Sequence, residues 1–470
     1  MGHFEFFNTR LYKYNVYIMN IKQMNTFSLL LLFCLYYLQI ASFRFNKING
    51  FFGTIGGKKL NKISLSGDGI IQGVFIEKGV PKQVVCHTIM TDRQVFMKKY
   101  PSHYFLLQSN FFNILLFIGK HMKLIDNNIN YEGRANTGLI YLKNHDLLLA
   151  LYERDRPYSL YIDYKNNCIY DYCKVLTHNP TFSAHPHVLP HNKIESLDYN
   201  VFGSHKGSWL HTYDDVLNLE KKQFIKTKYN SIVHDSISTH DYVYLPDCPL
   251  VFDMWKIIMS DTHIPMTFKK LPTSIIRFNK HTEKIDRYMF NESFFCFHFV
   301  GVKESESEIL LDVCMFEKID MDHLNKHLPK LYRLVINKET HEGNIFQPSQ
   351  LQCLHLDFPI KFLHNNEMKY ALNCLRVENN NVIMYGFVVL DTHLNILNFF
   401  EFPNKNDTFV GEIAYDNKSG CLIGLCIKDN RNVLFFYDIN ECKPNYQYLD
   451  HPHNELFSGG FHSIFHGSPF

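Results

Sequence analysis

The chain has 470 residues, 46% of them hydrophobic, which is enough apolar material for a large buried core. Its 48 basic residues are balanced by 46 acidic ones, for a net charge of +2, so charge gives no case for nucleic acid as a partner. Aromatic residues make up 15% of the chain, a proportion that suits half-buried β-sheets and tunnels for long apolar ligands.

An apolar run at residues 27–41 sets the N-terminus apart from the rest of the chain. Lys22 precedes this run, and Arg44 and Lys47 follow it. The run is short for a membrane span and has the length of the apolar region of a signal peptide. We therefore expect residues 1–45 to be a signal or anchor-like segment that leads the protein into the secretory route or an organelle, where it is membrane-associated. The alternative is a docking helix on a cytosolic protein. Residues 50–470 are expected to form a single domain.

Short strand-like segments follow one another along the rest of the chain. Apolar residues in alternation or in short runs predict strands at 70–76, 147–152, 158–162, 242–245, 382–390 and 433–437. Turn-forming clusters separate these segments at 165–167, 379–381, 416–420 and 428–432. Many short strands indicate an all-β sandwich, barrel or propeller, and the length favours a propeller, whose blades can tile about 400 residues with only short edges. Helical patterns at 91–99 and 321–328 are expected to form a small helical cap over the sheets.

Four histidines lie in short apolar segments at wide separations in the chain: His185, His234, His298 and His462. Strand alternation places His298 on the face opposite Phe295, Phe297 and Phe299. A buried imidazole needs a partner for each nitrogen, and a metal on one nitrogen with a carboxylate on the other meets that need. Four neutral imidazoles can hold one metal and leave two positions open, which suits Fe(II), a metal that needs a vacancy for oxygen. A zinc site is the other possibility, although structural zinc favours closely spaced ligands.

Short motifs surround these histidines and continue along the chain. They are GDGIIQGV at 67–74, GRANT at 133–137, LLALYE at 148–153, AHPH at 184–187, VHDSIST at 233–239, YVYLPD at 242–247, FH at 297–298 with Glu304, and GFHSIF at 460–465. In this order they resemble the motifs of the carotenoid cleavage oxygenase family, which includes apocarotenoid oxygenases and the retinoid isomerohydrolase. The sequence between the motifs is diverged.

The resemblance implies a seven-bladed β-propeller with one iron ion on its axis, below the helical cap. By motif match the iron ligands are His185, His234, His298 and His462. Two neighbouring histidines compete for these roles. His187 shares the AHPH segment, and His466 precedes a glycine as the last ligand of the family does.

The resemblance also implies three acidic residues that hydrogen-bond to the second, third and fourth histidines and orient their rings. Glu153 and Glu412 match two of them. Asp357 stands where the family has glutamate, so its shorter side chain must reach the imidazole directly or through a water. Glu401 has the family's neighbouring letters but fits the order of the motifs less well.

Thr137 matches the small side chain that, in the family, crowds one open metal position and leaves the other for oxygen. The chain departs from the family pattern at Gly301 and Val302, after the third histidine, and at Ser463, after the fourth. These departures affect packing and leave the ligand set intact.

The function implied is that of an Fe(II)-dependent dioxygenase that uses O2 to cleave a double bond of a carotenoid, apocarotenoid or related conjugated alkene. A lipophilic polyene would reach such an enzyme from a membrane, so we expect peripheral membrane contact. Two alternatives remain: an enzyme that uses the same iron for retinoid ester isomerisation, and a catalytically degenerate propeller that acts as a binding protein.

Overall fold

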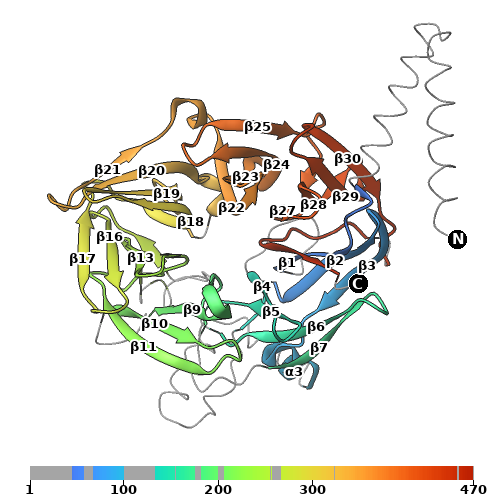
Figure 1. Cartoon of the computed structure of the whole chain (residues 1–470), viewed down its shortest axis with the longest axis horizontal. Coiled ribbons are helices and arrows are strands. Elements are labelled where there is room, and N and C mark those ends of the chain that lie inside the picture. Colours follow the sequence, from blue (N-terminus) through green and yellow to red (C-terminus); the bar gives the residue numbers. More distant parts are fainter. Residues whose placement is uncertain are drawn as a thin grey trace, which may run out of the picture.

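The computed structural model describes residues 45–57, 67–99, 133–153, 155–174, 182–199, 206–253, 256, 266–321, 323–452 and 455–468. Antiparallel sheets stand around a central axis in these residues (Figure 1). One α-helix, α3 (Asp92–Lys99), lies wholly within them. No helix in the described part of the chain is both long and apolar enough to cross a membrane. The apolar run at 27–41 lies outside the described residues, so the signal or anchor segment stays a prediction.

Five of the sheets have four strands each. The first contains β3 (Val80–Thr88), β2 (Gly69–Glu77), β1 (Gly50–Gly57) and β31 (Ser463–Gly467). The second contains β4 (Gly138–Leu142), β5 (Leu147–Leu151), β6 (Tyr158–Asp163) and β7 (Cys168–Lys174). The third contains β8 (His187–Val188), β9 (Ile194–Tyr199), β10 (Gly207–Tyr213) and β11 (Leu219–Lys226). The fourth contains β12 (Ile237–Ser238), β13 (Tyr242–Asp247), β16 (Ser274–Asn279) and β17 (Ile285–Met289). The fifth contains β18 (Phe295–Glu304), β19 (Glu308–Phe316), β20 (Lys330–Asn337) and β21 (Gly343–Phe346).

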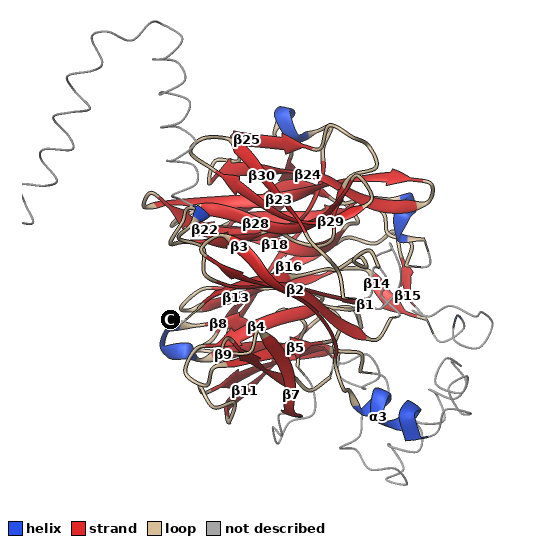
Figure 2. Ribbon diagram, turned by 90° about the vertical axis from the view of Figure 1, so that its right-hand side faces the viewer, coloured by secondary structure: helices blue, strands red, loops and turns tan. Residues whose placement is uncertain are grey.

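A nine-stranded sheet completes the ring. One part contains β22 (His355–His364), β23 (Glu367–Glu378), β24 (Asn381–Asp391) and β25 (Ile396–Glu401). The other contains β27 (Ala414–Asp416), β28 (Cys421–Lys428), β29 (Arg431–Asp438) and β30 (Lys443–Tyr448). The short strand β26 (Thr408–Phe409) pairs with both β24 and β28 and joins the two parts. A separate hairpin, β14 (Leu250–Phe252) with β15 (Met266–Phe268), lies on the same side of the ring as α3 (Figure 2).

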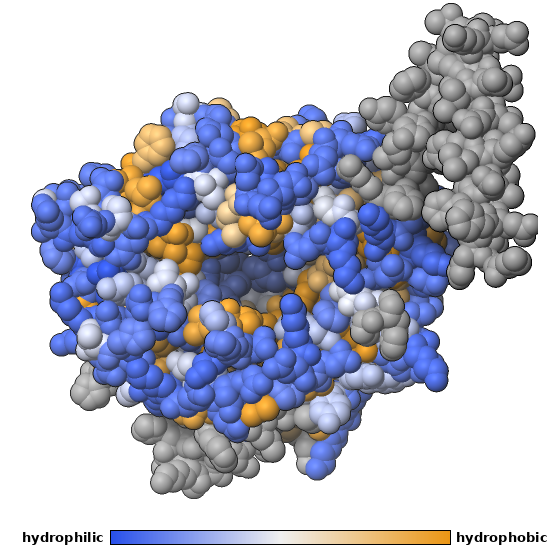
Figure 3. All heavy atoms as spheres, viewed as in Figure 1, coloured by the Kyte–Doolittle hydropathy of each residue, from blue (hydrophilic) through white to orange (hydrophobic). Residues whose placement is uncertain are grey.

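The ring closes between segments from opposite ends of the domain. β31 pairs antiparallel with β1, from Gly50 opposite Gly467 to Thr54 opposite Ser463. Because His462 directly precedes β31, this pairing also fixes where the last of the four histidines enters the centre. The face seen in Figure 3 is hollowed near the middle of the ring, with apolar residues on parts of the rim.

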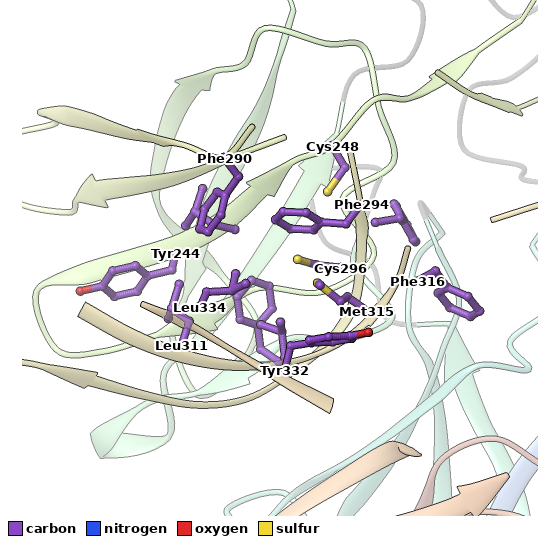
Figure 4. Close-up of a cluster of buried hydrophobic side chains, with 14 of the residues drawn as sticks. Tyr244, Cys248, Phe290, Phe294, Cys296, Leu311, Met315, Phe316, Tyr332 and Leu334 are labelled. Atoms are coloured by element: carbon purple, nitrogen blue, oxygen red, sulfur yellow. The ribbon is translucent and has the colours of Figure 1, made fainter. Parts of the chain in front are cut away.

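The core is divided among the interfaces between neighbouring sheets. One cluster packs Tyr244 of β13 and Phe290 against Leu311 and Met315 of β19 and Tyr332 of β20 (Figure 4). A second cluster joins the two parts of the nine-stranded sheet through Phe387, Phe400 and Phe435, among other residues. Aromatic and β-branched residues suit such pleated, two-sided packing, which explains the abundance of phenylalanine.

The structure confirms the strands predicted at 70–76, 147–152, 158–162, 242–245, 382–390 and 433–437 as β2, β5, β6, β13, β24 and β29. Two of the predicted turns are two-residue hairpin connections. Asn379 and Asn380 join β23 to β24, and Asp429 and Asn430 join β28 to β29, each residue with positive φ. Asn and Asp tolerate this left-handed conformation, which matches the twist of the flanking strands.

The helix predicted at 91–99 is present, and the prediction of a helix at 321–328 is wrong. α3 begins at Asp92, where the Thr91 side chain accepts a hydrogen bond from the Gln94 N–H and caps the first turn. The described residues between 321 and 328 contain only the 3-10 turn Leu324–Lys326. So short a segment gains too few hydrogen bonds to nucleate a helix unaided. α3 lies at the rim, beside β6 and β7 (Figure 1), so the described residues include no helical cap over the centre.

Candidate metal centre

Four imidazole rings from four separate segments meet at one place. The ring of His185 lies 4.5 Å from that of His234, 5.0 Å from that of His298 and 4.5 Å from that of His462, measured between centroids. His298 lies 5.2 Å from His234 and 5.1 Å from His462. The structure therefore brings together all four histidines that the sequence singled out.

The nitrogens of these rings face one another. One donor nitrogen from each of His185, His298 and His462 lies within 4.8 Å of the other two, a spacing that a single metal ion can bridge. His234 Nε2 lies 3.1 Å from His185 Nε2. His298 is only 2% exposed, and its buried Nε2 has no hydrogen-bond partner among the described residues. A buried polar atom with no partner is costly, and a metal ion would satisfy it.

The segment that carries His185 is held by hydrogen bonds and by a close backbone contact. Ser183 Oγ accepts a hydrogen bond from the His185 N–H at 2.9 Å, and the Ser183 N–H donates to Ser196 Oγ at 2.7 Å. Gly138 lies so near this segment that a Cβ there would stand 2.2 Å from the Ala184 carbonyl oxygen. Thr137, the residue before Gly138, is buried and bonds through Oγ1 to Asn136. Its predicted role beside the metal stays a prediction.

Two β-bulges in β18 shape the part of the centre around His298. The register with β19 shifts between Cys296 and His298 and again between Phe299 and Gly301. The first bulge breaks the alternation expected from the sequence, because the Phe297 and His298 rings lie near each other, with centroids 4.6 Å apart. The Phe297 ring stacks on that of His234 at 4.3 Å with an interplanar angle of 10°.

Asp235 stabilises this bulged segment. Its Oδ2 accepts a hydrogen bond from the Phe299 N–H at 2.8 Å, and its Oδ1 accepts one from the Ser236 N–H at 2.7 Å. A bulge leaves backbone groups without their usual ladder partner, and this buried carboxylate supplies one. The sequence analysis did not single out Asp235, although its position directly after His234 was a signal.

Three carboxylates stand behind three of the rings. Glu153 Oε1 lies 2.7 Å from His234 Nδ1, and Glu412 Oε2 lies 3.4 Å from His462 Nδ1. Asp357 Oδ1 lies 2.6 Å from His298 Nδ1, so the shorter side chain reaches its imidazole without a water. Such contacts direct the other ring nitrogen toward the centre and raise its basicity.

The backbone around Asp357 is itself irregular. The register between β22 and β23 shifts between Asp357 and Ile360, and Phe358 has a φ of +55°. This left-handed conformation is unfavourable for a bulky residue and persists only where the surroundings impose it. It brings the Phe358 ring to 5.7 Å from His298 and 5.6 Å from His462, and the sequence alone did not indicate this aromatic residue.

Burial and charge act differently on two of the histidines. Burial and then the neighbouring imidazoles hold the pKa of His185 well below its usual range, so this ring is neutral at physiological pH. Burial also opposes protonation of His462, but the charge of Glu412 and its hydrogen bond outweigh burial and raise the pKa. His185 therefore offers a lone pair to a cation, and the carboxylates behind the other three rings make the surroundings favourable to positive charge.

The competing residues lie apart from the centre. His187 Nε2 contacts Ser236 Oγ at 3.0 Å. The centroid of the His466 ring lies 3.6 Å from that of Tyr141 with the rings tilted by 33°, and His466 Nδ1 contacts the Tyr164 hydroxyl at 2.5 Å. Glu401 is exposed at the end of β25, while Asp357 contacts His298 directly.

Comparison with known proteins places the chain in a family. The model of the retinal pigment epithelial membrane protein family, RPE65, matches residues 45–416. The chain therefore belongs to this family, which confirms the resemblance to the carotenoid cleavage oxygenases. The carotenoid 9,10(9',10')-cleavage dioxygenase 1 of Arabidopsis thaliana is 27% identical over 344 residues, covering 66% of this chain and 61% of that protein. The chain thus spans less than two thirds of the length of this curated relative.

Solved structures show the same fold at low sequence identity. The lignostilbene dioxygenase of Pseudomonas brassicacearum superposes with a TM-score of 0.68 at 15% identity, over 90% of this chain and 93% of that one. The cobalt-substituted apocarotenoid oxygenase of Synechocystis gives a TM-score of 0.68 at 16% identity, with the same coverage.

Proposed function

We propose that this protein is a non-haem, Fe(II)-dependent dioxygenase that cleaves a C=C bond of a carotenoid, apocarotenoid or related conjugated alkene. In this reaction one atom of O2 goes to each alkene carbon, and two carbonyl products form. The observation that carries the proposal is the convergence of His185, His234, His298 and His462, with a carboxylate behind three of the rings. The named activities of the Arabidopsis, Pseudomonas and Synechocystis relatives support the same reaction class.

The four histidines would hold one Fe(II) through the nitrogens that face the centre. The donor set fits this metal, because imidazole is a common iron ligand and four ligands leave two positions open. When bound, Fe(II) supplies the capacity to activate O2. Glu153, Asp357 and Glu412 keep three of the rings oriented and, as carboxylates, offset the positive charge of the metal.

Aromatic side chains beside the histidines suit an apolar substrate. Phe297 lies flat on His234, and Phe358 lies next to His298 and His462. Both side chains present apolar surface beside the histidines, and their ring faces can stabilise positive charge that develops on a polyene. We assign to these two residues the apolar wall against which the reacting double bond lies.

We also infer that the ring is a seven-bladed propeller. Five sheets have four strands each, and the nine-stranded sheet consists of two four-stranded runs joined through β26. Counting those two runs as separate blades gives the remaining two. In this arrangement β31 completes the blade that contains β1 and closes the ring.

The experiment that tests the function combines metal analysis with product analysis. The purified full chain would be loaded with Fe(II) without oxygen, and its bound iron measured. It would then be incubated with a panel of carotenoids, apocarotenals and stilbenes under ¹⁸O2. We expect one iron per chain and aldehydes or ketones that carry ¹⁸O. Less than about one iron per ten chains after loading would contradict the proposal.

A second candidate is isomerisation of a retinoid ester with the same metal as a Lewis acid. The family whose model matches is named after a retinal pigment epithelial protein, so the experiment has to distinguish this reaction from oxidative cleavage. Labelled oxygen separates the two reactions, because isomerisation takes up no oxygen atom from the gas. A catalytically degenerate binding protein would bind the polyene and release it unchanged.

Peripheral membrane contact and a lipophilic partner follow from the proposed substrate class. Carotenoids partition into bilayers, so the enzyme must take its substrate from a membrane surface. The route by which residues 27–41 would bring the chain to that membrane stays a prediction.

A further inference from the structure

Two turns of the fourth sheet bring together a second group of side chains of the types that bind metals. This group is separate from the four histidines of the centre. In the β13–β16 pairing, Tyr242 stands opposite Asn279. The turn that precedes β13 therefore lies beside the turn that follows β16. His240 and Asp241 are in the first turn, and His281 is in the second.

The imidazoles of His240 and His281 converge on one oxygen of the Asp241 carboxylate. His240 Nδ1 lies 2.7 Å and His281 Nε2 lies 3.1 Å from Asp241 Oδ1. One potential ligand atom from each residue lies within 4.8 Å of the other two. All three side chains are exposed, so a metal ion could enter from solvent.

A buried anchor fixes the second turn. Lys280 is 7% exposed, and its Nζ donates to Glu195 Oε1 at 2.8 Å and to Ser238 Oγ at 2.9 Å. Its carbonyl oxygen accepts hydrogen bonds from Lys221 Nζ at 2.6 Å and Gln223 Nε2 at 2.9 Å. Lys280, which directly precedes His281, is therefore fixed by hydrogen bonds at both its side chain and its carbonyl oxygen.

Backbone hydrogen bonds connect and stiffen the two turns. The Lys280 N–H donates to the Asp241 carbonyl oxygen at 2.9 Å. Asn279 Oδ1 accepts hydrogen bonds from the N–H groups of His281 and Thr282 at 2.9 and 2.8 Å. These bonds fix the backbone of both turns, so binding of a metal has to order only the side chains.

We propose that His240, Asp241 and His281 form a zinc site in which water completes the tetrahedron. Two imidazoles and one carboxylate are a ligand set that Zn²⁺ accepts, with one position left to water. His240 and Asp241 come from one turn, and His281 from the neighbouring turn completes the set of three protein ligands. Bound zinc would tie the β12–β13 turn to the β16–β17 turn.

The test is zinc stoichiometry of the full chain without an added histidine tag. Chelator-treated protein would be dialysed against Zn²⁺ and its bound metal measured. We expect His281→Ala and Asp241→Asn each to lose about one zinc equivalent per chain relative to the natural sequence. His323→Ala is the matched control, because His323 is an exposed imidazole that contacts the Asp320 carboxylate but belongs to no group of three potential metal ligands in the described residues. The His323→Ala variant should bind as much zinc as the natural chain.

A second measurement checks that the loss is local. Since the three side chains are exposed, the melting temperatures of the variants in chelator should equal that of the natural chain. Added Zn²⁺ should raise the melting temperature less in His281→Ala than in His323→Ala. Equal zinc binding by the natural chain and His281→Ala would overturn the proposal. This comparison between variants holds whether or not zinc also enters the four-histidine centre. Failure of the proposed function would be seen separately, in the iron loading and product analysis.

Discussion

Asp357 Oδ1 lies 2.6 Å from His298 Nδ1, and both side chains are almost completely buried. This contact is made possible by the register shift after Asp357 and by the left-handed conformation of Phe358. A carboxylate with one methylene fewer than glutamate thus serves the same imidazole without a bridging water. The strand irregularity places the carboxylate where a longer side chain would otherwise be needed.

Replacement of Asp357 by Asn should weaken iron binding by about 10- to 100-fold, because the neutral amide no longer raises the basicity of His298 or fixes its tautomer. Anaerobic Fe(II) titration of the two proteins measures the change. Glu401→Gln is the control, since Glu401 is exposed and should leave iron affinity unaltered. If the two variants bind iron equally well, the supporting role of Asp357 is wrong.

His462→Ala and His466→Ala should fail in different ways. Loss of His462 removes a ring from the centre, so the iron retained after anaerobic loading and desalting should fall sharply. Loss of His466 removes its ring contact with Tyr141 and its polar contact with Tyr164. Iron should then be retained, while the free energy of unfolding in urea falls by about 1–2 kcal/mol. The reverse pattern would make His466 the ligand.

Asp235→Asn should destabilise the fold, because the bulged Phe299 N–H loses a charged acceptor in a buried place. We expect a loss of about 1–3 kcal/mol in the free energy of unfolding, measured with urea on the metal-free chain. Asp215→Asn, which alters an exposed hydrogen bond to Asn144, should change stability far less. Equal effects would show that the bulge does not depend on the Asp235 carboxylate.

His211 should make the fold sensitive to acid. This residue is 1% exposed, neither ring nitrogen has a hydrogen-bond partner in the part of the chain that the structure describes, and burial lowers the pKa of His211 to about 4. Since the unfolded chain binds the proton at about pH 6.5, stability falls as pH drops from that value toward 4. This residue alone should cost about 2 kcal/mol at pH 5 relative to pH 7.

The matched variant for that prediction is His211→Leu, which fills the buried position without a titrating group. Urea unfolding of both proteins at pH 7 and pH 5 isolates the contribution of His211 from those of the other histidines. The natural chain should lose more stability than the variant between these two pH values. Parallel losses would show that His211 is accessible to protons in the folded state.

The sequence by itself determined the class of fold and the set of histidines. Runs such as 382–390 and 433–437 and the Asn- and Asp-rich turns between strands depend on local preferences, which a sequence carries directly. The histidine motifs are short and ordered, so His185, His234, His298 and His462 could be named before their distances were known. The segment 321–328 shows the limit of local pattern, because its apolar spacing suggested a helix that the described residues do not contain.

Only the tertiary structure decided which of two plausible residues serves each role. Asp357 rather than Glu401 contacts His298, and His462 rather than His466 enters the centre, because strand register sets which side chains meet. Bulges in β18 and β22 shift that register by amounts that alternation cannot predict. The group of His240, Asp241 and His281 likewise exists only because β13 pairs with β16, a contact between segments that are distant in the chain.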